Sequence, residues 1–318
     1  MKKAVTMLLC LFLLSALLIS AACSSEPATT PTPTAVPAKY PLPVVDMLGR
    51  SVQLSQRPTH IVTTHPTATE TLYCVGGTAV GVDSSSKYPA EVQSLPKVGS
   101  AYSVNTEAIA ALNPDLIIIE ALTQAGIISS LEKLGVPVIA LRAASLDDIN
   151  QSLTLVGEVV DREEAASQAI AEIQDRIEAV QGNCTVSKSV LIFVPDAQRN
   201  IYAAKPESYP GTVAALLGMD NPAAGLPDNG PYPGFTLFTA EQALTSDADI
   251  VFTITQAPPP APRLSASLSQ IPGFNQMAAV KAGNVVELDP ALFLQAQGPR
   301  IADAVEEMLR LINNEVTS

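Results

Sequence analysis

The sequence predicts an α/β protein made of two halves that one long helix joins. Over residues 44–144, short apolar strands alternate with helices and are separated by Gly or Pro. Residues 145–182 then keep a helical period that only Gly157 interrupts before Gly182. Over residues 183–318 the alternation of strands and helices resumes.

The N-terminal half opens with an expected hairpin over residues 46–54, because Gly49 supplies a turn between two short runs. Residues 115–119 read DLIII, a continuous apolar run that is typical of a strand buried on both faces of a parallel sheet. The other elements of this half follow the same alternation: strands at 61–64, 80–82 and 137–141, and helices at 69–75, 106–112 and 127–134.

The long helix begins at Ser145, which forms a variant of the capping box with Asp148 three residues later. Its apolar positions recur every three or four residues as far as Val180. At about 1.5 Å per residue, one helix over 145–182 would be on the order of 50 Å long, enough to connect two lobes. The C-terminal half then has expected strands at 189–194, 249–255 and 285–288, and expected helices at 212–217, 240–244 and 300–312.

The first 22 residues have the features of a signal peptide. Two lysines precede an apolar stretch over residues 7–19 that is too short to span a bilayer comfortably. Cleavage before Cys23 with acylation of its sulfur would give a lipoprotein, whereas the SAA sequence before it also fits ordinary signal peptidase. Residues 23–43 are rich in Pro and Thr and are expected to be a tether. We therefore expect an extracytoplasmic protein, anchored to the outer face of the cell membrane by Cys23 or, alternatively, secreted or periplasmic and soluble.

The composition excludes several functions. The 318 residues carry 18 Lys and Arg against 31 Asp and Glu, a formal net charge of −13, without the basic clusters that nucleic-acid binding requires. The sequence has no P-loop, GxSxG, HExxH or dinucleotide motif and only two histidines, so neither an enzyme nor a metal site is predicted. Once the leader is removed and Cys23 acylated, Cys74 and Cys184 are expected to be buried free thiols or, alternatively, a disulfide.

Tyrosines gather in the loops that connect the predicted strands and helices. In open α/β sheets, ligands bind beyond the carboxyl ends of the strands. A tyrosine combines a flat apolar face with a polar tip, which suits a large, half-polar ligand, although each ring is equally expected to pack beneath its own loop. Aromatic residues make up only 4% of the chain, and five of its seven tyrosines lie in such loops: Tyr88, Tyr102, Tyr202, Tyr209 and Tyr232.

Short motifs follow one another along most of residues 44–312. They are DxxGRxV at 46–52, PxxIV at 58–62, PxxTExL at 66–72, KVG at 97–99, NxE at 105–107, LxPDLII at 112–118, LGVPV at 134–138, GxxN at 218–221 and AVKAGNV at 279–285. In this order and spacing they resemble the class III periplasmic substrate-binding proteins, which deliver ferric siderophores, haem or vitamin B12 to ABC importers. The resemblance implies two Rossmann-like lobes bridged by one long helix, a ligand cleft between the lobes, and capture without catalysis by a monomer.

One segment indicates a corrinoid within that family. The sequence GVDSSSKYP at 81–89 resembles the loop that lines the cofactor in vitamin B12-binding proteins, and Tyr232 and Phe293 fall where those proteins have cleft tryptophans. The cargo implied is a corrinoid such as cobalamin, with a ferric siderophore or haem as alternatives. Tyr88 and Tyr232 are expected on opposite walls of the cleft, and His65 as a contact to the ligand or, less commonly, to its cobalt. The full set of expected ligand-binding residues is His65, Tyr88, Pro89, Tyr102, Tyr202, Tyr232 and Phe293.

The resemblance also implies docking to the permease and ATPase of an ABC importer. Glu70 matches the carboxylate that the N-terminal lobe of this family presents on its outer surface, and the alternative is a solvated Glu near the start of a helix. In the C-terminal lobe, the acid nearest to the family position is Glu207. A scavenger or sensor domain that works without a transporter is the alternative function.

Overall fold

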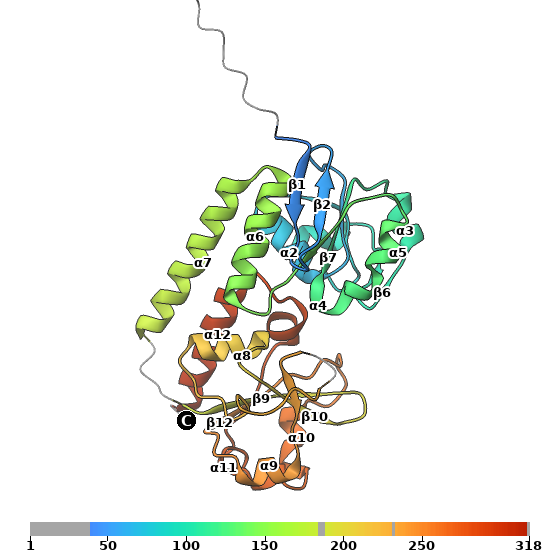
Figure 1. Cartoon of the computed structure of the whole chain (residues 1–318). Coiled ribbons are helices and arrows are strands. Elements are labelled where there is room, and N and C mark those ends of the chain that lie inside the picture. The colour runs from blue at the N-terminus through green and yellow to red at the C-terminus, as the bar shows by residue number, and fades with distance from the viewer. Residues whose placement is uncertain (1–38, 184–187, 231–232, 317–318) are drawn as a thin grey trace, which may run out of the picture. The chain divides into compact units, whose positions relative to one another are not determined.

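The computed structural model describes residues 39–183, 188–230 and 233–316, and these form two α/β lobes as the sequence predicted (Figure 1). The predicted signal peptide, Cys23 and most of the tether lie outside the described residues. The tether was expected to extend to residue 43, but the first strand already begins at Leu42. The Tyr40 hydroxyl donates a hydrogen bond of 2.8 Å to the Val159 carbonyl, so the fold begins at about this residue.

The N-terminal lobe is built on a four-stranded parallel sheet in the order β4-β3-β7-β8. Every residue of β3, β7 and β8 is buried, as expected for a parallel sheet that is covered on both faces. The strands are β3 (Ile61–Thr63), β4 (Ala79–Gly81), β7 (Leu116–Glu120) and β8 (Val138–Leu141), and the helices are α2 (Pro66–Cys74), α3 (Thr106–Ala111), α4 (Ala121–Gln124) and α5 (Ile128–Glu132).

Two antiparallel hairpins complete this lobe. The predicted hairpin is present as β1 (Leu42–Val45) and β2 (Ser51–Leu54), with Gly49 at a positive φ of 76° in the connecting turn. A smaller hairpin, β5 (Gly99–Ser100) and β6 (Ser103–Val104), lies before α3 and was not predicted. Its turn contains Tyr102, so this unpredicted hairpin determines where that side chain lies.

The prediction of one continuous helix over 145–182 is wrong, because the segment forms α6 (Leu146–Val160) and α7 (Glu163–Asn183). Asp161 adopts the left-handed conformation (φ 60°, ψ 53°), and the Arg162 N–H donates to the Gly157 carbonyl, which ends α6. Neither Gly nor Pro marks this break, and Asp is among the few non-glycine residues that tolerate the left-handed region. Because the apolar positions keep a helical period on both sides of Asp161, the sequence pattern did not predict the break.

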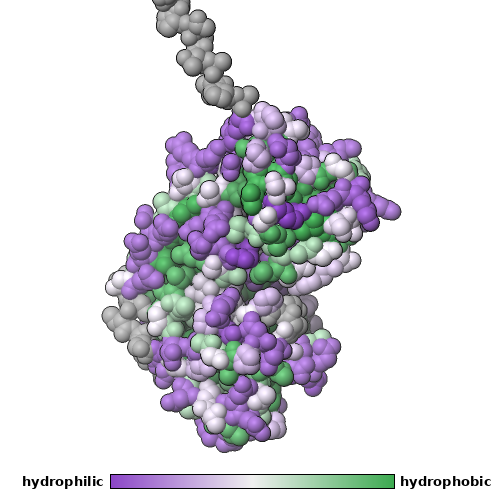
Figure 2. Space-filling model, in the orientation of Figure 1, coloured by the Kyte–Doolittle hydropathy of each residue, from purple (hydrophilic) through white to green (hydrophobic). Residues whose placement is uncertain are grey.

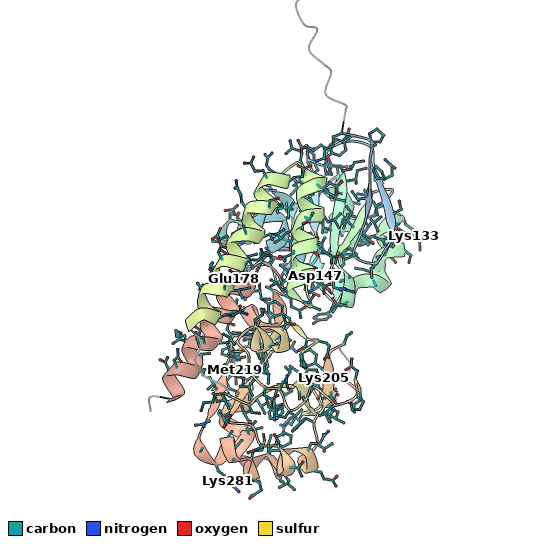
Figure 3. The ribbon with its side chains drawn as sticks, turned by 60° about the vertical axis from the view of Figure 1, so that its left-hand side comes forward. Lys133, Asp147, Glu178, Lys205, Met219 and Lys281 are labelled. Carbon is teal, nitrogen blue, oxygen red and sulfur yellow. The ribbon has the colours of Figure 1, made fainter. Side chains whose placement is uncertain are left out.

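The two helices pack side by side, and the chain reverses its direction between them (Figure 1). Gly157 permits the close approach, since a Cβ there would lie 2.6 Å from the Cβ of Ala166. Asp147 at the start of α6 and Glu178 near the end of α7 lie at a similar level (Figure 3). The predicted capping box is present at Ser145 and Asp148. Only α7, about 31 Å long at 1.5 Å per residue, leads from one lobe to the other.

The C-terminal lobe contains a five-stranded sheet in the order β11-β10-β9-β12-β13. Strands β9, β12 and β13 are parallel, whereas β10 runs antiparallel to both of its neighbours. Strands β10 and β11 were not predicted. The strands are β9 (Val190–Pro195), β10 (Ile201–Ala204), β11 (Phe235–Leu237), β12 (Ile250–Thr253) and β13 (Val285–Glu287), and the helices are α8 (Tyr209–Leu216), α9 (Ala240–Thr245), α10 (Leu264–Ser267), α11 (Ala278–Ala282) and α12 (Ile301–Val316).

One hydrophobic core extends through both lobes. It includes Leu72 of α2, Ile173 of α7, Tyr209 of α8 and Val305 of α12, all of which are buried. Helix α12 packs against α7 and α8, so elements of both lobes meet along the bridging helix. The lobes therefore share packing in addition to the chain connection. No helix among the described residues is long and apolar enough to cross a membrane.

Candidate functional site

A cavity of about 790 Å³ lies between the lobes, where the outline of the molecule narrows (Figure 2). Its walls are the segments that follow the strands of both sheets. His65 and Pro66 come after β3, and Glu120, Leu122 and Thr123 lie at the end of β7 and just after it. Residues 194–198, at the end of β9 and just after it, and residues 255–257 after β12 belong to the facing wall. This is the position where open α/β sheets bind ligands.

The structure brings three of the predicted ligand-binding residues together in this cavity: His65, Tyr102 and Tyr202. Tyr102 is 75% exposed at the rim of the N-terminal lobe. Tyr202 comes from β10, and its hydroxyl donates to an Asp196 carboxylate oxygen at 3.3 Å. Tyr232 lies outside the described residues, although the neighbouring Pro233 lines the cavity. The remaining predicted residues lie elsewhere.

Phe293 was expected in the cleft, but its side chain is fully buried in the core of the molecule. It belongs to a short π-helical turn, Ala291–Gln295, after β13. In this turn the next two residues, Leu294 and Gln295, face the cavity instead. The prediction identified the right segment, but the direction of each side chain depends on the turn.

Tyr88 and Pro89 do not line the interlobe cavity either, which corrects the prediction that Tyr88 forms one of its walls. They lie at a second cavity of about 430 Å³ beside α2, α7 and the start of α12. The Arg300 guanidinium stacks on the Tyr88 ring at 4.7 Å from its centroid. The preceding loop is fixed because the Ser86 hydroxyl bonds to the Asp83 carboxylate and, at 2.8 Å, to the Thr69 hydroxyl. This anchorage directs Tyr88 toward Arg300.

Cys74 also lines the second cavity, and it is an exposed free thiol, not the buried one that was expected. It is the last residue of α2, where the side chain is no longer covered by the sheet. Cys184 lies outside the described residues. Among the described residues, no group of three or more His, Cys, Asp or Glu side chains is placed to hold a metal ion.

Glu70 is buried and paired, so the prediction of an outward-facing docking carboxylate is wrong. Its two carboxylate oxygens accept hydrogen bonds from Nε and Nη2 of Arg300 at 2.7 and 2.8 Å. Glu70 comes from α2 of the N-terminal lobe, and Arg300 precedes α12 of the C-terminal lobe. Burial raises the pKa of Glu70, and the Arg300 guanidinium opposes that shift. The pair therefore connects the lobes on the side of the second cavity.

His65 is the N-cap residue of α2. Its Nδ1 accepts a hydrogen bond of 3.2 Å from the Thr67 N–H, which satisfies one of the free donors at the start of the helix. Burial lowers the pKa of His65 from its ordinary value of 6.5 to about 4, so the imidazole is neutral at pH 7. Since Nδ1 is an acceptor, the proton of the neutral ring resides on Nε2. His65 thus presents an N–H donor in the cavity lining, and metal ligation through Nε2 would require this proton to move.

Polar side chains of the cavity are mostly uncharged amides and hydroxyls. None of the described residues that line it is Lys or Arg, and its two carboxylates, Glu120 and Asp196, both accept hydrogen bonds from nearby backbone N–H groups. Sequence reasoning missed these acids and all of the lining glutamines, because no motif marks them. The glutamines are Gln198, Gln256, Gln295 and Gln297.

Glu287 of β13 holds the loop after β12, which forms part of the C-terminal wall. Its carboxylate accepts hydrogen bonds from the Thr253 hydroxyl at 2.6 Å and from the Thr255 N–H at 2.8 Å. Burial acts to raise the pKa of Glu287, but these hydrogen bonds outweigh burial and lower it. Arg263 donates to the carbonyls of Thr255 and Ala257, at 3.0 and 3.2 Å. The Arg263 guanidinium therefore stabilises the loop after β12 through these two hydrogen bonds.

We expect Glu70→Gln to lower the free energy of unfolding by roughly 2–4 kcal/mol, because the partly buried Arg300 charge, whose side chain is 19% exposed, would lose its partner. Glu132→Gln is a matched control, since it breaks the ion pair of Arg50 with a half-exposed carboxylate and should cost about 1 kcal/mol or less. Chemical denaturation of both variants measures the difference. Equal losses in the two variants would contradict the assignment of Glu70 as a buried connection between the lobes.

His65 should also make stability depend on pH. Its pKa is lower in the folded state, so the unfolded chain binds a proton first as the pH falls, and folding stability decreases between about pH 6.5 and pH 4. The decrease in the free energy of unfolding should total on the order of 3 kcal/mol, because each pH unit between the two pKa values contributes about 1.4 kcal/mol. His65→Asn keeps a capping side chain but does not titrate, so it should lose this dependence.

The control is His60→Asn, because His60 is exposed. Urea denaturation of both variants at a series of pH values isolates the contribution of His65. If both variants retain the slope of the wild type, the carboxylates alone account for it and the assignment to His65 is wrong.

Comparison with known proteins agrees with the two-lobed fold. Residues 61–292 match the family described as Periplasmic binding protein. An uncharacterized ABC transporter substrate-binding lipoprotein of Bacillus subtilis, YvrC, is 27% identical over 86% of each chain. A cobalamin-binding protein of Halobacterium salinarum is 25% identical over 86% of this chain and 75% of its own. The crystal structure of Staphylococcus aureus SirA complexed with staphyloferrin B has a TM-score of 0.71 at 18% identity, covering 85% of this chain and 98% of SirA.

Proposed function

Since the chain belongs to the periplasmic binding protein family and is a substrate-binding protein of the ABC importer type, we propose that its interlobe cavity captures a corrinoid. The observation that carries this proposal is the lining, in which aromatic rings and glutamines occur together without a Lys or Arg among the described residues. A corrinoid presents a broad apolar face and a rim of uncharged amide side chains. Tyr102 and Tyr202 suit the faces, and the glutamines suit the amides.

The alternative ligands are ferric siderophores and haem. Most carboxylate siderophores are anionic as iron complexes, and haem carries two propionates, so both require positive charge nearby. The described lining instead contains Glu120 and Asp196, which would repel an anion. Haem also needs an axial ligand, and His65 could ligate through Nε2 only if its proton moved to Nδ1, which would break the hydrogen bond from the Thr67 N–H. These features favour the corrinoid.

We expect Tyr102→Ala to weaken cyanocobalamin binding by about 1–3 kcal/mol, because it removes a large apolar face from the rim of the cavity. Isothermal titration calorimetry of the domain over residues 40–318 measures the affinity. The matched control is Tyr88→Ala, since Tyr88 is also exposed but lines the second cavity. That variant should bind within a factor of two of the wild type.

The same titrations with haem and with a ferric carboxylate siderophore test the choice of cargo. Binding of either one, without binding of cyanocobalamin at tens of micromolar, would overturn the corrinoid proposal. Equal losses in the Tyr102 and Tyr88 variants would contradict the placement of the ligand in the interlobe cavity.

Delivery would take place at the membrane, with the protein anchored through Cys23 and docked on the permease. With Glu70 buried, Glu207 is the proposed docking carboxylate of the C-terminal lobe; its side chain is 65% exposed and lies 3.8 Å from the amine of Lys205. Lys205 is in the C-terminal lobe, just after β10 (Figure 3). The alternative is a scavenger or sensor that does not need an importer.

We expect Glu207→Arg to reduce stimulation of the cognate importer's ATPase in reconstituted vesicles at least several-fold, while cyanocobalamin affinity is unchanged, because charge at a docking rim mainly sets association. Glu241→Arg, on an exposed position of α9, is the control and should behave like the wild type. Full stimulation by the Glu207 variant would remove this residue from the docking surface. Absence of stimulation by the wild-type protein would favour the scavenger or sensor.

A further inference from the structure

Gln124, the last residue of α4, is a buried side chain that makes four hydrogen bonds. Only 1% of it is exposed. Its Nε2 donates to the carbonyls of Ala101 and Thr64 at 2.7 and 3.0 Å. Its Oε1 accepts from the Thr64 hydroxyl at 2.8 Å and from the Glu120 N–H at 3.1 Å. The two donors and the acceptor oxygen of the amide are therefore all used.

These four bonds join three separate segments of the N-terminal lobe. Thr64 follows β3, Ala101 lies in the turn between β5 and β6, and Glu120 ends β7. The partners are up to 60 residues from Gln124 in the sequence. One side chain thus fixes the positions of three chain segments relative to one another.

Each of the three segments carries residues of the cavity wall at its bond with Gln124 or within three residues of it. His65 follows Thr64, and Tyr102 follows Ala101. Leu122 and Thr123 follow Glu120, whose carboxylate accepts hydrogen bonds from the backbone N–H of both. The ligand-facing wall of the N-terminal lobe therefore rests on the amide of Gln124, although Gln124 does not itself line the cavity.

The chemistry of this position is specific to glutamine. Two carbonyl oxygens require two donors, and the Thr64 hydroxyl and the Glu120 N–H require an acceptor, which only a primary amide supplies together. A carboxylate at the same place would face two carbonyl oxygens without a proton to share. An apolar side chain would leave all four partners without their bonds in a buried site.

We propose that Gln124 is a positioning residue for ligand binding, which preorganises His65, Tyr102 and Leu122 before the ligand arrives. The choice of cyanocobalamin as the ligand in the experiment below rests on the proposed function. The preorganisation of the wall by Gln124 does not depend on which ligand binds. Fixing a binding wall in advance lowers the cost of ordering it on binding. Loosening the wall should therefore reduce affinity more than it reduces the integrity of the fold.

Two variants test the proposal. Gln124→Glu keeps the shape of the side chain and leaves at most one donor, on a protonated carboxyl group, and Gln124→Met keeps its length without any donor or charge. In the ligand-free protein we expect amide hydrogen exchange to accelerate about tenfold or more at residues 64 and 65 and over 100–103 and 121–124, and to stay unchanged in α12. We also expect the cyanocobalamin dissociation constant to rise on the order of tenfold at 20 °C in both variants.

The matched control is Gln181→Glu. Gln181 lies on α7 and donates a single hydrogen bond of 2.7 Å to the Leu216 carbonyl, far along the chain from the three segments. It should change neither exchange in the wall nor the dissociation constant. This separates the effect of the Gln124 network from the general effect of replacing a glutamine that donates to a carbonyl.

These experiments distinguish failure of the Gln124 proposal from failure of the corrinoid proposal. If the wild type does not bind cyanocobalamin, the corrinoid proposal fails, and the exchange measurement on the ligand-free protein still decides whether Gln124 preorganises the wall. Wild-type exchange rates in the folded Gln124 variants would overturn the proposal. Faster exchange in the variants, with a dissociation constant within twofold of the wild type, would also overturn it. Failure of both Gln124 variants to fold, while Gln181→Glu folds, would overturn it as well, because the role of Gln124 would then be purely structural.

Discussion

The ion pair between Glu70 and Arg300 is the constraint on which the arrangement of the two lobes depends. It joins the first long helix of one lobe to the residue before the last helix of the other, 230 positions away in the sequence. A buried carboxylate is tolerated only while its partner is in place, since an unpaired charge in such a site is costly. The stacking of Arg300 on Tyr88 adds a second contact with the N-terminal lobe. The geometry of one guanidinium thus fixes how the lobes meet.

Other contacts between the lobes also hold them in a fixed arrangement. Helix α7 spans both lobes, α12 packs along it, and one apolar core continues from Leu72 to Val305. A cavity between lobes held in this way has much of its shape before a ligand binds, and we expect closure by a small rotation and not a wide hinge. Each wall also has its own internal support: Gln124 on the N-terminal side, and Glu287 on the C-terminal side.

Polar side chains have different roles at the interlobe cavity and at the second cavity. Around the interlobe cavity, backbone N–H groups hold the carboxylates of Glu120 and Asp196, and amides, hydroxyls and aromatic rings make up much of the remaining surface. Around the second cavity, Glu70 and Arg300 are used for attachment between the lobes. Arg176 of α7 does the same by bonding Asp303 and Glu306 of α12. Positive charge is thus used to hold the fold, and the described lining of the ligand cavity has none.

The sequence by itself determined the two α/β lobes, the buried strand predicted at 115–119, the hairpin at Gly49 and the cap at Ser145, because local periodicity and turn chemistry encode such features. It also identified the segments that meet at the cavity, since strand ends converge in this architecture. Only the tertiary structure decided the break at Asp161, the burial of Glu70 and Phe293, and the role of Gln124. These depend on which distant group lies opposite each side chain, and a pattern read along the chain contains no information on that.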